Sequence, residues 1–228
     1  MSLAKILPLL LAAAPIALAT PALAQTAPAG PAAGITTQLP RGAVPSHYAI
    51  TVTPDAANLK FTGKVTIDVA VSTAMPTLVL NAADLTFGDV MLTPAKGKAI
   101  KGMAKVDADA QTVTLDFGKP LAPGNYKLAI TYAGVINTQA NGLFALDYTD
   151  NDGAAKRALF TQFEAPDARR FVPSWDEPSY KATFDLSAII PTGELAVGNM
   201  PVTSTKDLGG GKTQVTFDTS PKMSSYLL

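Results

Sequence analysis

Cysteine is absent from this sequence of 228 residues, and His47 is its only histidine. Without cysteine, the chain can form neither a disulfide nor a thiolate metal site. A catalytic zinc site takes three protein ligands, commonly including two histidines, so this sequence does not contain a recognisable one. His47 precedes Tyr48 at the start of a predicted strand, and we interpret it as a packing or edge residue. Composition leaves a Ser-His-Asp set open, but no nucleophile-elbow sequence supports one.

The sequence also lacks an excess of charge of either sign. It has 18 basic and 18 acidic residues, and loss of the N-terminal segment discussed next would remove Lys5 and leave 17 basic residues. A nearly neutral chain offers no electrostatic footprint for nucleic acid or for an anionic membrane surface. We therefore expect no nucleic-acid partner.

Residues 1–24 have the features of a secretory signal peptide. Lys5 precedes the apolar run Ile6–Ala19, and Ala22-Leu23-Ala24 forms an A-x-A cleavage signal. A spanning helix needs about 20 apolar residues, and two prolines interrupt this run, so an uncleaved anchor is the weaker interpretation. The sequence predicts export to the periplasm or the extracellular medium, with no stable membrane insertion after cleavage.

The rest of the chain divides into a tether and one body. Residues 25–38 are mostly Ala, Pro, Gly and Thr, with no charge and no periodicity, which is typical of a flexible linker. Residues 39–228 are long enough for one domain with a substantial core. Because the sequence ends on the apolar segment Pro221–Leu228, we expect the parent chain to continue and this domain to be incomplete at its C-terminus. A C-terminal strand tucked into the sheet is the alternative.

The body alternates apolar and polar residues with the period of two that marks half-buried strands. No sustained helical pattern follows the signal segment. Strands are predicted over 47–53, 63–71, 77–80, 85–92, 111–117, 126–132, 158–164, 181–190 and 214–219. Gly209–Thr213, "GGGKT", lacks the earlier glycine and the following helix of a phosphate-binding loop, so it is predicted to be a hairpin turn. Many short strands indicate an all-β fold, an antiparallel β-sandwich.

Charge and aromatic residues gather in one stretch, Phe160–Leu186, which contains the only tryptophan, Trp175. If residues 158–164 form a strand, Gln162 and Glu164 point to the same face and could receive one ligand together. On spacing alone the simpler interpretation is a wet strand face, or an ion pair of Glu164 with one of the two following arginines.

The same stretch, "TQFEAPDARRFVPSWDEPSYKATFDL", closely resembles the signature of the N-terminal domain of aminopeptidase N-type zinc metallopeptidases. "LPRGAVPSHYAITVTPDAANLKFTGKVTIDV", "LVLNAADLTF" and "PKMSSYLL" resemble other segments of that domain, in the same order. The resemblance therefore covers essentially all of residues 39–228. Val172 and Ser174 depart from the pattern, which often has an aromatic residue and a cysteine at these positions.

The resemblance implies a saddle-like β domain that leans over the active site of a separate catalytic domain. It implies that Glu164 grips the free α-amino group of a peptide substrate and that Gln162 helps to bind the peptide. Arg169, Arg170, Asp176 and Glu177 would then form an ion-paired structural loop. The family's zinc motif, H-E-x-x-H, and its G-x-M-E-N segment do not occur in the sequence. Zinc and peptide hydrolysis would thus belong to the full-length enzyme, and we expect this chain alone to be inactive.

Two other functions stay open at this point. One is a non-catalytic β-sandwich module of the same lineage that serves in binding or as a scaffold. The other is a relative that hydrolyses lipid epoxides, although that branch tends to carry glutamine at the position of Glu164.

Overall fold

The computed structural model describes residues 38–228. The predicted signal peptide, 1–24, and all of the predicted linker except Gln38 lie outside the described residues. The described part is built of strands and two short 3₁₀ turns, η1 (Ala168–Arg170) and η2 (Ser225–Leu227). Its strands are β1 (Ala43–Asp55), β2 (Lys60–Val71), β3 (Met75–Asn81), β4 (Leu85–Pro94), β5 (Ile100–Asp107), β6 (Thr112–Leu121), β7 (Gly124–Val135), β8 (Gly142–Thr149), β9 (Ala155–Gln162), β10 (Thr183–Pro191), β11 (Val202–Gly209) and β12 (Lys212–Phe217).

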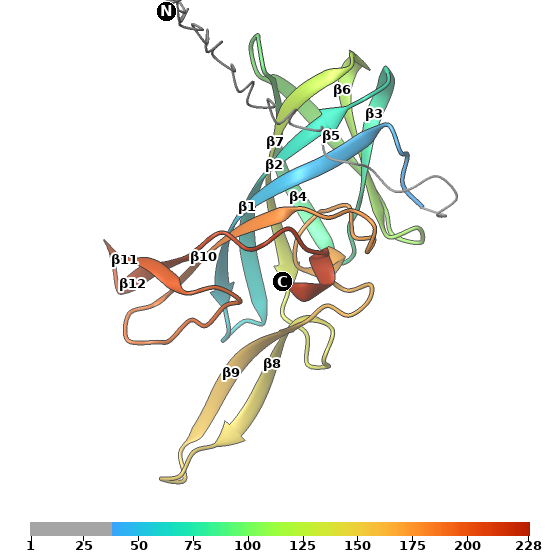
Figure 1. The fold of residues 1–228 in the computed structure, drawn as a ribbon. Coiled ribbons are helices and arrows are strands. Elements are labelled where there is room, and N and C mark those ends of the chain that lie inside the picture. The colour runs from blue at the N-terminus through green and yellow to red at the C-terminus, as the bar shows by residue number, and fades with distance from the viewer. Residues whose placement is uncertain (1–37) are drawn as a thin grey trace, which may run out of the picture.

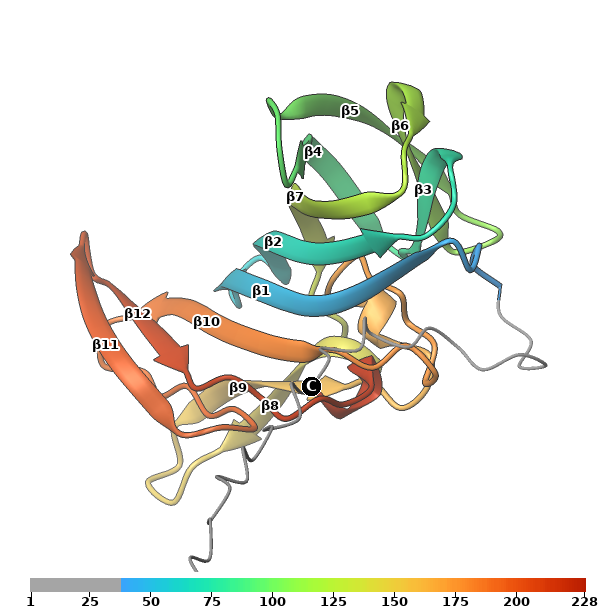
Figure 2. The same ribbon diagram turned by 45° about the horizontal axis from the view of Figure 1, so that its top comes forward.

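Within residues 38–228, ten strands form one sheet in the order β11-β12-β10-β1-β2-β7-β4-β5-β6-β3. β8 and β9 form a separate hairpin that projects from the body (Figure 1). The all-β prediction is confirmed. One pairing differs from a purely antiparallel arrangement, because β10 runs parallel to β1, with His47 opposite Thr183. The sheet is strongly curved, with β11 and β12 rising at one side and β4 and β5 at the other (Figure 2).

The period of two in the sequence becomes the burial pattern of the central strands. Along β2, Val65, Ile67 and Val69 are at most 2% exposed, whereas the residues between them reach solvent. Leu78 and Leu80 of β3 belong to the same core cluster as these three residues. Burial of each large aliphatic side chain contributes about 1.5–3 kcal/mol to folding. The main core therefore extends from the centre of the sheet to β3, whereas Ile190, Val215 and Phe217 of β10 and β12 form a second, smaller cluster.

Sequence patterning missed three strands, β5, β8 and β11. All eight residues of β11 are exposed, and its sequence, VTSTKDLG, buries no face. Such a strand is formed by its hydrogen bonds to β12, which leave no apolar alternation to detect. The GGGKT prediction is confirmed: β11 and β12 form a hairpin, and Gly209, Gly210 and Gly211 all have φ between +61° and +73°. No helix in residues 38–228 is long and apolar enough to cross a membrane.

Gly63 marks the closest approach between backbone and side chain in the centre of the sheet. It lies opposite Tyr132 in the β2–β7 register. A Cβ at this position would lie 2.3 Å from the ring of Tyr132, which is itself 4% exposed and cannot swing into solvent.

We predict that Gly63→Ala lowers the free energy of unfolding by about 1–3 kcal/mol, because the added methyl group overpacks the core. Urea unfolding followed by the fluorescence of Trp175 measures this change. Thr62→Ala, on the exposed face of the same strand, is the control and should change stability by less than about 0.5 kcal/mol. Equal stability of Gly63→Ala and the unmodified chain would contradict the described packing.

Candidate functional site

The two candidate residues lie where the projecting hairpin returns to the body. β9 ends at Gln162, and Glu164 lies in the turn that follows. The predicted strand over 158–164 therefore ends two residues too late, and it begins three residues after the observed start at Ala155. Gln162 and Glu164 are nevertheless both exposed, as predicted, and Phe163 between them is 2% exposed.

Phe163 fixes the start of this turn. Its ring packs against that of Phe171 with centroids 5.3 Å apart, and its carbonyl accepts a hydrogen bond from the N–H of Asp167 at 3.2 Å. Glu164 forms no hydrogen bond or ion pair with any part of the chain that the structure describes. The alternative in which Glu164 pairs with Arg169 or Arg170 is therefore wrong. A free carboxylate is held at the surface on an anchored backbone.

The hairpin itself is held at its base and along one face. The backbone N–H of Asn137 donates to the carbonyl of Leu143 at 2.8 Å, and the carbonyl of Asn137 accepts a hydrogen bond from the N–H of Ala145 at 2.8 Å. Arg157 donates to both carboxylate oxygens of Asp147 across the hairpin and to the carbonyl of Ala56 in the β1–β2 turn. The bond to Arg157 lowers the pKa of Asp147. These contacts fix the orientation of the hairpin relative to the body, and with it the position of Gln162 at the end of β9.

Gly142 pairs with Gln162 at the base of the hairpin. Its φ is +67°, a conformation that favours glycine, and a Cβ there would lie 2.9 Å from Cβ of Arg170. Close packing at Gly142 thus couples the strand that carries Gln162 to the loop that follows Glu164.

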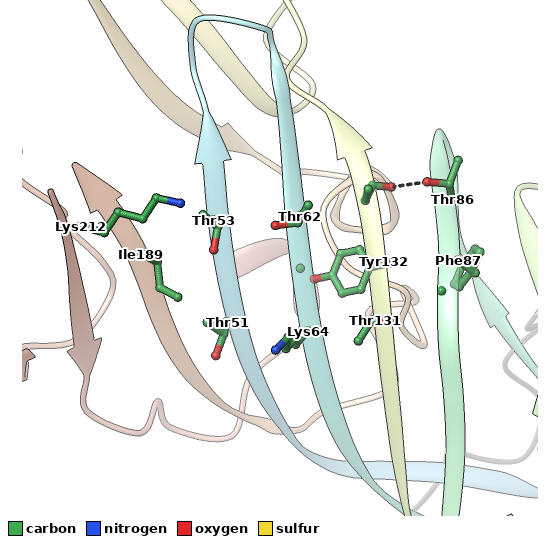
Figure 3. A pocket seen from close by; sticks show the side chains of 13 residues that line it. Thr51, Thr53, Thr62, Lys64, Thr86, Phe87, Thr131, Tyr132, Ile189 and Lys212 are labelled. Atoms are coloured by element: carbon green, nitrogen blue, oxygen red, sulfur yellow. Dashed lines mark hydrogen bonds between the residues drawn. The ribbon is translucent and has the colours of Figure 1, made fainter. Parts of the chain in front are cut away.

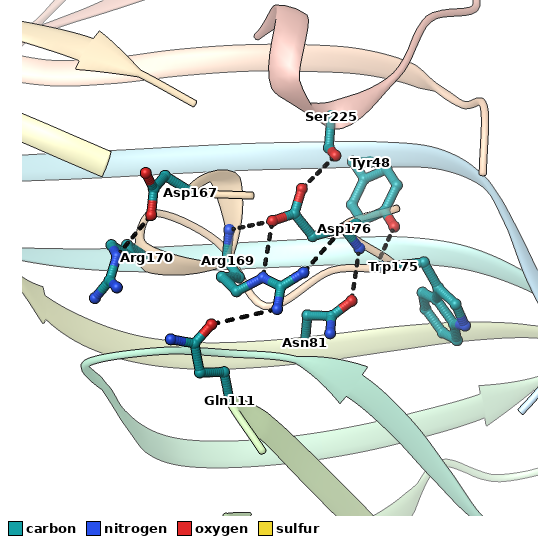
Figure 4. A network of polar contacts seen from close by, with 9 residues as sticks. All are labelled: Tyr48, Asn81, Gln111, Asp167, Arg169, Arg170, Trp175, Asp176 and Ser225. Carbon is teal, nitrogen blue, oxygen red and sulfur yellow. Dashed lines mark hydrogen bonds and ion pairs between the residues drawn. The ribbon is translucent and has the colours of Figure 1, made fainter. Parts of the chain in front are cut away.

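A buried ion pair holds that loop (Figure 4). Arg169 and Asp176 have side chains 6% and 2% exposed, and the Nε of Arg169 lies 3.1 Å from Oδ2 of Asp176. Arg169 also donates its backbone N–H to Oδ2 and an Nη2 hydrogen to the backbone carbonyl of Asp176. Multiple hydrogen bonds of this kind are what a buried charge pair requires to offset its desolvation. The predicted structural role of both residues is confirmed.

The partners that complete this pair come from distant parts of the chain. Gln111 accepts a bond from Nη1 of Arg169 at 3.3 Å, and Asn81 accepts the N–H of Asp176 at 3.0 Å. Ser225, in η2, donates to Oδ1 of Asp176 at 2.6 Å. The network therefore joins the turns beside β3 and β6 to the last residues of the chain.

The neighbouring residues add further ties. Arg170 donates to Asp167 at 2.8 Å and is bonded to Asp84, in the turn between β3 and β4. Burial alone would lower the pKa of Arg170, but these two carboxylates raise it overall. Glu177 accepts the backbone N–H groups of Gln38 and Leu39 at 2.8 and 3.1 Å. All four charged residues assigned to structure thus bond within the body.

Trp175 anchors the same loop in the core. It is 1% exposed, and its backbone N–H donates to the hydroxyl of Tyr48 at 3.1 Å. Burial raises the pKa of Tyr48 far above its ordinary value, so this phenol stays neutral. Sequence reasoning missed the roles of Tyr48, Asn81 and Gly142, because each acts through contacts that are remote along the chain.

His47 joins the parallel strands β1 and β10. Its Nδ1 lies 2.8 Å from the hydroxyl of Thr183, and its Nε2 lies 3.2 Å from Oδ2 of Asp185. Thr219 donates to the other carboxylate oxygen of Asp185. These contacts agree with the interpretation of His47 as a packing residue. The edge alternative is wrong, because β1 lies inside the large sheet between β10 and β2.

The residues present do not fit a zinc ion. Nowhere in residues 38–228 do three His, Cys, Asp or Glu side chains gather closely enough to hold a metal. Glu164, Asp167 and Asp176 are close in sequence, but the last two are occupied by arginines.

Comparison with known families identifies this arrangement. The description "Peptidase M1 N-terminal domain" matches residues 44–227, which is nearly the whole described body. The chain belongs to the peptidase M1 family. Within this family it is 43% identical to Aminopeptidase N of Acetobacter pasteurianus over 191 residues, which cover 84% of this chain and 53% of that protein. It is 37% identical to Aminopeptidase M1 of Arabidopsis thaliana over 195 residues, and 35% identical to the puromycin-sensitive aminopeptidase of Caenorhabditis elegans over 193 residues.

The chain spans about half the length of the Acetobacter relative, and the matches cover 22% and 20% of the other two proteins. Its M1 relatives are named aminopeptidases, which are hydrolases. The match places residues 44–227 at the N-terminal domain, and the candidate residues Gln162 and Glu164 lie inside the matched range.

We predict that Asp176→Asn lowers the free energy of unfolding by about 3–5 kcal/mol, because it leaves the Arg169 guanidinium buried without a counter-ion. Urea unfolding monitored by Trp175 fluorescence gives the value.

Asp89→Asn is the matched control. Asp89 and Lys101 form an ion pair in which both side chains are 75% exposed, so the exchange should leave stability unchanged within error. A loss of less than about 1 kcal/mol in Asp176→Asn would show that the buried pair does not hold the loop.

Proposed function

We propose that this chain is the N-terminal, substrate-recognising domain of an exported zinc aminopeptidase, and that Glu164 binds the free α-amino group of the peptide. The observation that carries the proposal is an exposed carboxylate without a partner in the described chain, fixed on the turn between the buried Phe163 and η1, in which Ala168 and Arg169 are buried. The family membership supplies the class of substrate: peptides with a free N-terminus.

The chemistry of the substrate suits this residue. An α-amino group has a pKa of about 7.7–8.0, so it is largely cationic at neutral pH. A carboxylate that accepts its hydrogen bonds gains about 1.5–3 kcal/mol once water is excluded. A peptide with a blocked N-terminus would leave that carboxylate unpaired, so the enzyme would reject it. Gln162 lies two residues before Glu164. Its side-chain amide can donate a hydrogen bond to a backbone carbonyl of the peptide and so fix the position of the peptide in the site.

The exposed face of the β8–β9 hairpin is apolar, which suggests that another domain covers it. Phe144 pairs with Phe160 and Leu146 with Ala158 in the β8–β9 register, on the same face as Gln162. Leu146, Tyr148 and Phe160 are each about half exposed, at 52%, 48% and 47%. An apolar stripe of this kind beside a polar site is typical of a surface that another domain covers. We assign that partner to the remaining length of the parent, whose catalytic domain would complete a dry pocket around Glu164.

We assign zinc and hydrolysis to that catalytic domain. Adding zinc to the present chain should not produce peptide hydrolysis, because its described residues contain no group of metal ligands. Export is proposed from the signal-like residues 1–24, which would deliver the enzyme to the periplasm or to the medium. A binding or scaffold module of the same lineage is the alternative, and the parent's activity distinguishes the two.

In the full-length parent, we predict that Glu164→Gln lowers kcat/KM for aminoacyl anilides by about 10- to 100-fold, because the charge-assisted bond to the substrate ammonium is lost. Gln162→Ala should give a smaller decrease. Steady-state kinetics at neutral pH measures both.

Glu194→Gln is the control, since Glu194 is an exposed glutamate in the turn after β10. It should leave kcat/KM unchanged. If Glu164→Gln behaves like Glu194→Gln, Glu164 does not bind the amine. A parent with no aminopeptidase activity at all would favour the scaffold function.

A further inference from the structure

A hollow on the large sheet lies apart from the candidate amine site. It has a volume of about 640 Å³ and is lined by residues of β1, β2, β4, β7, β10 and β12 (Figure 3). Its lining includes no residue of β8, of β9 or of the turn that carries Glu164. The hollow therefore does not adjoin Glu164, whereas the β8–β9 hairpin leads directly into the turn on which this residue lies.

One edge of the β8–β9 hairpin is open. The outer edge of β8 is held by Asn137, whose backbone bonds to the carbonyl of Leu143 and to the N–H of Ala145. In the part of the chain that the structure describes, β9 pairs with β8 and with no other strand. Its second edge is therefore free to accept a further strand.

The bonds to Asn137 also determine which backbone groups of β9 face the open edge. The N–H and the carbonyl of a strand residue point to the same side, and this side alternates along an antiparallel pair. Since Leu143 and Ala145 point away from β9, the residues opposite them, Thr161 and Leu159, point away from β8. Neither of these two backbones bonds to another segment of residues 38–228. The open edge thus offers backbone donors and acceptors at Thr161 and Leu159.

Aromatic side chains lie beside this edge on one face of the hairpin. Phe160 points to the same face as Gln162, because they are two residues apart on one strand. Phe160 is 47% exposed, and its ring packs on that of its cross-strand partner Phe144 with centroids 5.9 Å apart. A strand added at the open edge would place one of its side chains directly opposite Phe160.

Glu164 determines the direction of such a strand. It follows the end of β9, so a peptide whose amino group is bound there runs back along β9 and is antiparallel to it. Addition of an extended peptide to a free sheet edge is a recurring mode of peptide recognition. With the first peptide residue opposite Gln162, where β9 ends, the second lies opposite Thr161, the third opposite Phe160 and the fourth opposite Leu159.

This register leaves the first peptide bond accessible. The second and fourth residues exchange backbone hydrogen bonds with Thr161 and Leu159, whereas the first residue turns its carbonyl away from β9. That carbonyl belongs to the bond that an aminopeptidase cleaves, and it points to the side from which another domain can reach it. The side chain of the third residue contacts Phe160 and lies in line with Phe144.

We propose that the substrate peptide adds to the free edge of β9 as a third, antiparallel strand, and that Phe160 and Phe144 bind an apolar side chain at its third residue. The register rests on the proposed function, because Glu164 holds the peptide amine in it. The parent would then prefer peptides of at least four residues with an apolar third residue. Its catalytic domain would cover the outer part of the apolar face, at Leu146 and Tyr148.

Isothermal titration calorimetry of the full-length parent tests this peptide site with Ala-Ala-Phe-Ala-Ala and Ala-Ala-Ser-Ala-Ala. Reduction of the first amide to CH2–NH prevents cleavage, so binding is measured whether or not the parent is active. We expect the phenylalanine peptide to bind about tenfold more tightly, because its ring packs on Phe160. In Phe160→Ser the ratio of the two Kd values should fall to less than about twofold.

Tyr148→Ser is the matched control. Tyr148 is 48% exposed and lies on the same face of the hairpin, but it is opposite Lys156 and beyond the reach of the third peptide residue. This variant should keep the tenfold ratio. General damage to either variant affects both peptides alike and cancels in the ratio.

N-methylated forms of the phenylalanine peptide test the strand pairing with the unmodified parent. The N–H of the fourth residue points to the carbonyl of Leu159, so its methylation should raise Kd about fivefold. The N–H of the fifth residue points away from β9, and its methylation should change Kd by less than about twofold. The peptide site is overturned if neither peptide binds, if both bind equally, if Phe160→Ser keeps the tenfold ratio, if Tyr148→Ser abolishes it, or if the two methylations have equal effects.

Acetylation of the peptide amine tests the amine site separately. If Glu164 binds the amine, acetylation weakens binding to the unmodified parent but not to Glu164→Gln. An equal effect of acetylation in both proteins would contradict the amine site. The binding site along β9 is judged by the Phe160 ratio and the methylated peptides, which do not depend on that result.

Discussion

The ion pair between Arg169 and Asp176 determines where the candidate site can be. Both side chains are almost fully buried, and each charged group forms several hydrogen bonds. Asn81, Gln111 and Ser225 reach it from three separate parts of the chain. A charge pair buried in this way cannot shift without losing several bonds together, so the loop around it is effectively rigid.

A few contacts connect this rigid loop to Glu164 at the surface. Phe163 packs on Phe171, which directly follows η1, and Arg170 ties the same segment to Asp167 and Asp84. Glu164 is therefore an exposed side chain on a fixed backbone. That combination suits recognition, because the carboxylate stays hydrated until a cation arrives while its position is already set. The nearest charged residues before and after it, Arg157 and Asp167, form hydrogen bonds with other residues and not with Glu164.

The sequence was a good guide wherever a strand has one buried face. β2 and β7 alternate clearly, and their prediction differs from the structure only at the ends. β11 could not be found in this way because it buries nothing, and the parallel pairing of β1 with β10 depends on contacts between residues about 136 positions apart. The spacing of Gln162 and Glu164 predicted their exposure but not the turn between them. The buried network was predicted only as an ion-paired loop, since Asn81 and Ser225 carry no local signal of their distant partner.

The most direct test of the account is a double-mutant cycle in the full-length parent. It combines Glu164→Gln with removal of the α-amino group from a competitive peptide-like inhibitor, and it measures the four inhibition constants at neutral pH. If Glu164 binds the amine, the two changes are coupled by about 1.5–3 kcal/mol, and the variant no longer discriminates between inhibitors with and without the amine. A coupling energy of zero, with both enzymes preferring the amine equally, would contradict the account.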